Sequence, residues 1–222
     1  PPRSTLFPYT TLFRSTDILV ISDDAYFGLQ YEADNLRESM FALLAGAHPR
    51  ILAAKVDGQT KEDYVWGFRG GFITFSGPEL TETQLDALVK KLMGVVRSSV
   101  SNSTAPTQHI LAKAMNDPSY LPQKAEFAAT MERRYRVVKS FLSSHTAPAG
   151  LVPLPFNSGY FMCFECRGYS AEDLRIRLLD DRGIGTISIQ DKWLRVAFSS
   201  VDEEKLSDLY AEIYEVAATF GR

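Results

Sequence analysis

The sequence has few cysteines and histidines, little net charge and no long apolar run. Two cysteines in 222 residues do not make a disulfide framework, so we expect a reducing, cytoplasmic compartment. No apolar run approaches the roughly 18 residues needed to cross a bilayer, so no membrane partner is expected. The net charge of −3 is too small to indicate a nucleic-acid partner. Hydrophobic residues still make up 45% of the chain, which is enough for a globular core.

The N-terminus stands apart from the rest of the sequence. Thr5–Ser15 reads TLFPYTTLFRS, which is one translation of a common sequencing-adapter oligonucleotide. We therefore interpret residues 1–15 as adapter-derived and exclude them from fold reasoning. Natural sequence is expected to begin near Thr16.

Strand-like and helix-like segments alternate in the first half of the chain. Short apolar runs predict buried strands over 17–22, 50–56 and 71–75. Apolar residues at helical spacing predict helices over 34–45 and 81–96, and Thr81 with Gln84 forms a capping box at the start of the second. This alternation is typical of an α/β fold with a mostly parallel sheet.

The second half of the chain has a different pattern of predicted helices and strands. A long helix is predicted from about 121 to 144, followed by a proline-rich break. Strands and helices then follow one another through short loops, which predicts a smaller α+β domain. The segments are strands over 160–165, 185–189 and 194–198, and helices over 170–181 and 202–220.

Five residues in three short segments are candidates for chemistry. They are Asp23 and Tyr26 after the first strand, Lys61 with Arg69 eight residues later, and Arg195 in a late strand. Taken singly, each fits an ordinary surface or capping role. In this order and spacing they resemble fold-type-I pyridoxal-phosphate (PLP) enzymes, specifically the class I/II aminotransferases.

The resemblance implies a fold and a domain division. Residues 16–130 correspond to the C-terminal part of a PLP-transferase major domain, with a mostly parallel sheet and helices. Residues 131–222 correspond to a small C-terminal α+β domain. The glycine-rich phosphate loop, the aromatic that stacks on the cofactor ring and an asparagine beside the ring's 3-oxygen lie upstream of this region in the family. We therefore expect the chain as written to bind PLP poorly and to be inactive.

The resemblance also implies a role for each cofactor-binding residue. Lys61 is the Schiff-base lysine and the group that moves the proton during catalysis. Asp23 keeps the pyridine nitrogen protonated, and Tyr26 donates a hydrogen bond to the 3-oxygen. Arg69 binds the phosphate through its bidentate fork, and Thr60 contributes a hydroxyl.

Substrate contacts are implied further along the chain. Arg195 corresponds to the arginine that binds the substrate α-carboxylate. Arg97 lies in a stretch that, in the family, reaches the neighbouring subunit's site and can bind a distal carboxylate, although a surface role at the end of a helix is the simpler interpretation. Gly67, at +6 from the lysine, agrees with the family. Gly58 departs from it, because many members carry a hydroxyl at −3.

The predicted activity is transfer of an amino group from an amino acid to a 2-oxo acid. The enzyme is expected to be a cytoplasmic homodimer that acts in a biosynthetic process. Two alternatives remain open: another class I/II PLP reaction, such as that of a C–S lyase or decarboxylase, and the aminotransferase-like domain of a transcriptional regulator.

Cys163 and Cys166 form a CxxC in a strand, where this spacing points the thiols to opposite faces. With no further cysteine pair or nearby histidine, we interpret both as packing residues and expect no metal site.

Overall fold

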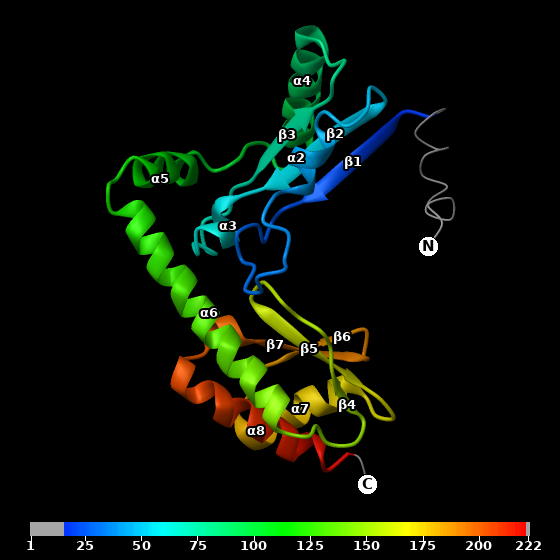
Figure 1. Cartoon of the computed structure of the whole chain (residues 1–222), viewed down its shortest axis with the longest axis vertical. Coiled ribbons are helices and arrows are strands. Elements are labelled where there is room, and N and C mark those ends of the chain that lie inside the picture. Colours follow the sequence, from blue (N-terminus) through cyan, green and yellow to red (C-terminus); the bar gives the residue numbers. More distant parts are fainter. Residues whose placement is uncertain (1–15, 221–222) are drawn as a thin grey trace. The chain divides into compact units, whose positions relative to one another are not determined.

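Two compact units make up residues 16–220, the part of the chain that the computed structural model describes (Figure 1). Unit 1 comprises residues 16–29 and 36–124, and unit 2 comprises residues 30–35 and 125–220. The segment interpreted as adapter, residues 1–15, lies outside the described residues. The expected division into a major-domain part and a small domain after residue 130 stays a prediction. No helix in residues 16–220 is long and apolar enough to span a bilayer.

Unit 1 is built on a three-stranded sheet. Its strands, in spatial order, are β1 (Ile18–Asp23), β2 (Ile51–Asp57) and β3 (Phe72–Ser76). β1 pairs with β2 in parallel, so that Asp23 lies opposite Val56. β3 runs antiparallel to β2, with Phe72 opposite Asp57, because the chain returns directly through residues 58–71. The predicted α/β class is confirmed, and the parallel arrangement applies to the β1–β2 pair.

Helices of very different length accompany this sheet. They are α2 (Met40–Leu44), α3 (Gln59–Glu62), α4 (Glu82–Ser99), α5 (Ala105–Met115) and the first turn of α6 (Tyr120–Ser144). The predicted capping box is present at α4, where the Thr81 N–H donates to Gln84 Oε1 at 2.9 Å. The helix predicted over 34–45 is wrong in its first part. Ser39 caps the helix by accepting from the Phe41 N–H at 3.0 Å, and residues 30–35 belong to unit 2.

Many apolar side chains of unit 1 are exposed. Leu19 and Ile21 on β1 are 55% and 62% exposed, and α4 has no buried residue although its apolar stripe forms as predicted. The prediction that 17–22 and 71–75 are buried strands is therefore wrong for the described chain. Burial of a strand requires a layer on each face, and no element of residues 16–220 covers these side chains. β2 matches its prediction better, because Ile51, Ala53 and Ala54 are buried.

Unit 2 packs helices onto an antiparallel sheet. The sheet order is β4 (Leu151–Pro153), β5 (Phe161–Cys166), β7 (Trp193–Ala197) and β6 (Ile187–Ile189). The helices are α6 from Ala125 onward, α7 (Ala171–Arg182) and α8 (Leu206–Ala217), with short 3₁₀ turns η1 (Phe198–Ser200) and η2 (Glu203–Lys205). Figure 1 shows α7 and α8 beside this sheet. The predicted α+β architecture is confirmed.

The core of unit 2 lies between one face of the sheet and its helices. Side chains of β5 alternate in burial, as expected for a strand covered on one face. The ring of Tyr210 on α8 lies 5.9 Å from Phe141 on α6 and 6.1 Å from Phe164 on β5, measured between centroids. α7 begins at the predicted cap, where Ser170 accepts from the Asp173 N–H at 3.0 Å. Most of the fully buried large side chains belong to this unit.

Two neighbouring leucines of α7 test this core. Leu178 is 0% exposed and Leu179 is 46% exposed. Truncation of a buried leucine leaves a cavity, so Leu178→Ala should lower the free energy of unfolding by about 3 kcal/mol. Leu179→Ala should change it by less than about 0.5 kcal/mol. Urea unfolding followed by circular dichroism measures both, and equal effects would contradict the described packing.

Candidate active site

The parallel pairing of β1 with β2 brings the candidate residues to one edge of the sheet. Asp23 is the last residue of β1, and the next N–H, that of Asp24, donates to the Val56 carbonyl at 2.8 Å. The chain then turns, and the Ala25 N–H donates to Asp23 Oδ1 at 3.1 Å. Ligands of open α/β sheets bind beyond the carboxyl ends of such strands. The turn after β1 is therefore placed where a ligand site is expected.

Lys61 lies on this edge beside the same turn. It is carried by α3, a single helical turn in the connection from β2 to β3. Its Nζ lies 4.0 Å from the centroid of the Tyr26 ring. The sequence placed Lys61 and Tyr26 in one site, and the structure brings them into contact.

The connection over residues 58–71 closes on itself. Gly58 packs against Gly70 so tightly that a Cβ at Gly58 would overlap the Gly70 carbonyl oxygen. Thr60 Oγ1 donates to the Phe68 carbonyl at 3.3 Å across the same loop. The glycine at −3 from Lys61 therefore has a packing reason, since a side chain there would force the two limbs apart.

A small cavity of about 120 Å³ opens between the turn after β1 and this loop. It is lined by Ala25, Val56, Asp57, Gly58, Thr60, Lys61, Arg69 and Gly70. An amine, a guanidinium and a hydroxyl thus face one space, and the last two are the donor types that suit a phosphate. This donor set, with an amine beside it, fits PLP.

A network of charged side chains connects the ends of β1 and β2 beside this cavity. Lys55 Nζ lies 2.6 Å from Asp57 Oδ2 and 3.9 Å from Asp24 Oδ2. Asp24 also accepts hydrogen bonds from the hydroxyls of Ser22 and Ser39. The hydrogen bond to Asp57 raises the pKa of Lys55 above its ordinary value despite partial burial. Sequence reasoning missed this network, although a lysine inside the apolar run RILAAKV was a signal for it.

Arg195 lies in unit 2, on β7. Its guanidinium lies 4.6 Å from the centroid of the Phe161 ring. Its Nε is buried and has no hydrogen-bond partner among the described residues. A buried donor without an acceptor is unfavourable, so this atom suits an anionic ligand.

Arg97 is in the last turn of α4 in unit 1. Its Nη1 donates to Ser101 Oγ at 2.6 Å, and the residue is exposed. This local contact is the one expected of an arginine at the end of a helix, where a cation is favourable.

The two cysteines lie as the CxxC spacing predicted. Cys166 is buried, whereas Cys163 is on the opposite face of β5, across from Arg195 of β7. Both are free thiols. Burial raises the pKa of the Cys166 thiol to about 11, so it is a poor nucleophile at neutral pH.

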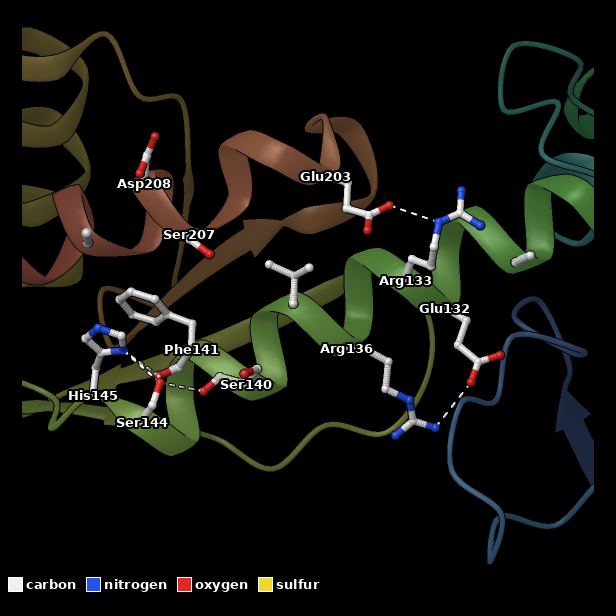
Figure 2. Close-up of a pocket in the computed structure, with 13 residues that line it drawn as sticks. Glu132, Arg133, Arg136, Ser140, Phe141, Ser144, His145, Glu203, Ser207 and Asp208 are labelled. Atoms are coloured by element: carbon white, nitrogen blue, oxygen red, sulfur yellow. Dashed lines mark hydrogen bonds and ion pairs between the residues drawn. The ribbon is translucent and has the colours of Figure 1, made fainter.

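A larger cavity lies in unit 2 but contains none of the predicted site residues. It has a volume of about 840 Å³ and is lined by α6 together with Glu203, Ser207 and Asp208. Figure 2 shows that both of its arginines pair with acids: Arg133 with Glu203 at 3.0 Å, and Arg136 with Glu132 at 3.2 Å. We place the candidate site at the smaller cavity because its cations face a shared space.

The chain belongs to the aminotransferase class I and II family. Its sequence matches that family over residues 1–213, which includes the segment interpreted as adapter. The cofactor of this family is PLP, so family membership implies PLP as the cofactor. No curated protein matches the sequence as a relative.

Solved aminotransferases share this fold. An aromatic aminotransferase from Pyrococcus horikoshii is 19% identical with a TM-score of 0.69, over 97% of this chain and 55% of that one. An alpha-aminoadipate aminotransferase from Thermus thermophilus, complexed with N-(5'-phosphopyridoxyl)-L-leucine, is 16% identical with a TM-score of 0.73, over 95% and 52%. An aminotransferase from Anaerococcus prevotii is 21% identical with a TM-score of 0.73, over 96% and 50%. The chain thus spans about half the length of these proteins.

The closed loop can be tested with trypsin, which cleaves after Lys61 and Arg69. Gly58→Ala should accelerate both cleavages about tenfold, because overpacking against the Gly70 carbonyl costs about 1–3 kcal/mol and populates the open loop. Gly67→Ala is the matched control, since a Cβ there meets nothing within 4 Å. Cleavage rates followed by mass spectrometry should stay unchanged for the control, and equal rates in both variants would contradict loop closure.

Proposed function

We propose that this chain is part of a PLP-dependent aminotransferase that transfers an amino group from an amino acid to a 2-oxo acid, with Lys61 as the cofactor-binding lysine. The chain by itself is expected to bind PLP weakly and to be inactive. The observation that carries the proposal is the cavity at the edge of β1 and β2, where Lys61, Thr60 and Arg69 face one space beside the turn after Asp23. Membership of the aminotransferase class I and II family supports the reaction type.

Some residues of this chain are assigned to cofactor binding, and Lys61 is also assigned to proton transfer. When bound, PLP supplies an electron-withdrawing ring that accepts the electron pair left at the substrate α-carbon. The Lys61 amine would hold the cofactor and would move the proton at that carbon. The Asp23 carboxylate would keep the ring nitrogen protonated, and the Tyr26 hydroxyl would donate to the ring's 3-oxygen. Arg69 and Thr60 would bind the phosphate.

Substrate binding is assigned to arginines. Arg195 would hold the α-carboxylate, a role that its buried, unpartnered Nε supports. Arg97 is the weaker candidate: it could bind a second carboxylate in a dicarboxylate substrate, but its exposed position and its contact with Ser101 favour a surface role at the end of α4. The proposal includes a homodimer, which family resemblance supports, a cytoplasmic location, which the low cysteine content supports, and a biosynthetic role.

Reductive trapping tests the role of Lys61. The chain is mixed with PLP, treated with borohydride and digested, and the phosphopyridoxyl group is located by mass spectrometry. Lys61 should carry at least about tenfold more label than Lys90, whose side chain is 73% exposed. The reason is that binding of the cofactor phosphate at the site raises the local concentration of the PLP aldehyde near Lys61. Lys61→Ala should abolish the main adduct and Lys90→Ala should not. Label spread over lysines in proportion to exposure would contradict the proposal.

Arg69 is tested in the same assay. Loss of a charge-assisted phosphate contact should raise the PLP concentration for half-maximal Lys61 labelling about tenfold in Arg69→Met. The control is Arg50→Met, which removes an exposed arginine paired with Asp17 at 3.3 Å in the same unit. An unchanged concentration in Arg69→Met would remove Arg69 from the site.

A further inference from the structure

A cluster of polar side chains holds the residues that directly follow Lys61. Tyr120 Oη donates to Asp63 Oδ1 at 2.5 Å, and Lys124 Nζ donates to the same oxygen at 2.7 Å. Lys124 Nζ also lies 3.3 Å from Glu62 Oε1. Tyr120 and Lys124 are one turn apart at the start of α6, so one helical face reaches both acids.

The cluster is sheltered from solvent, unlike an ordinary surface ion pair. The side chains of Asp63 and Lys124 are 10% and 28% exposed, whereas those of Lys90 and Asp86 on α4 are 73% and 60% exposed. Partial burial opposes the charged form of Lys124, but the hydrogen bond to Asp63 and the charges of Glu62 and Asp63 outweigh it and raise the pKa of Lys124. The ammonium therefore stays charged at neutral pH and keeps both contacts.

The helix that carries Lys61 needs such support. α3 has four residues and no side-chain cap at its start, and a single turn is unstable in isolation. Two acids at its C-terminal end are unfavourable there unless a cation neutralises them. The Asp63 N–H donates to the Gln59 carbonyl at 3.0 Å, so Asp63 closes the turn.

The backbone immediately after the cluster is strained. Tyr64 has a φ of +58°, in the left-handed region that bulky side chains rarely adopt. Its N–H donates to the Lys61 carbonyl at 3.2 Å. Such a conformation persists only where surrounding contacts fix it, and the preceding residue, Asp63, is held by Tyr120 and Lys124.

We infer that Lys124 and Tyr120 are positioning residues for Lys61: by holding Asp63 and Glu62 they fix the turn of α3 and so the direction in which the Lys61 side chain leaves the backbone. The significance for catalysis rests on the proposed function, whereas the positioning itself does not. Neither residue touches the cavity lined by Lys61, Thr60 and Arg69.

Amide hydrogen exchange of the full chain measures the positioning directly. The Asp63 and Tyr64 amides are the reporters, since both donate within the turn. Lys124→Met should accelerate their exchange about tenfold, the effect of losing a partly sheltered charge-assisted hydrogen bond. Lys124→Arg should restore most of the protection, and Tyr120→Phe, which removes only a hydroxyl, should give a smaller acceleration at the same amides. Lys90→Met is the matched control and should leave them unchanged.

Two results would overturn the inference. One is unchanged exchange at Asp63 and Tyr64 in both Lys124→Met and Tyr120→Phe. The other is an equal acceleration throughout unit 1, which would indicate a general structural role. A double variant sharpens the test, because Lys124→Met should have little further effect once Asp63→Asn has removed its partner.

Reductive trapping separates this inference from the proposed function. If Lys61 is labelled selectively in the parent chain, Lys124→Met should reduce that labelling several-fold while Lys90→Met leaves it unchanged. If Lys61 is not labelled in the parent chain, the proposed function fails, and the exchange measurement still decides whether Lys124 and Tyr120 fix the turn.

Discussion

The parallel pairing of β1 with β2 is the contact on which the candidate site depends. It aligns Asp23 with Val56, so the turn that carries Tyr26 and the loop that carries Lys61 begin at the same edge of the sheet. A slip of one residue would move every β1 side chain to the opposite face and carry Asp23 away from this edge. Lys55 reinforces the register, because it lies on β2 between the carboxylates of Asp24 and Asp57.

The second requirement is that a short helix keeps one orientation. α3 cannot supply this by itself, and the contacts that stabilise it come from both sides. The packing of Gly58 against Gly70 closes the loop at its base. Lys124 and Tyr120 hold the residues after Lys61 from the start of α6. The site thus draws on segments that lie about sixty residues apart in the sequence.

Local signals in the sequence predicted local structure well. The capping residues Thr81 and Ser170 begin helices where expected, and the apolar run of β2 forms a buried strand. The spacing of Lys61 and Arg69 identified two residues that line one cavity. These features depend on neighbours within a few positions, which a sequence pattern records directly.

Features set by distant partners escaped prediction. The apolar run of β1 suggested burial, but burial depends on a covering layer that the run does not encode. The helix expected over 34–45 begins only at Met40, where Ser39 caps it, and residues 34–35 pack with unit 2. Lys124 was one charged residue among several on a long amphipathic helix, and no local pattern linked it to Asp63.

The closed base of the loop changes the meaning of the eight-residue interval between Lys61 and Arg69. Once Gly58 meets Gly70, the two limbs are aligned by that contact and by Thr60 with Phe68, whatever the length of chain at the tip. Trp66 and Gly67, at the tip, are exposed. An insertion at the tip would alter the interval yet leave both side chains facing the same cavity, so motif searches that demand a fixed interval would overlook such proteins.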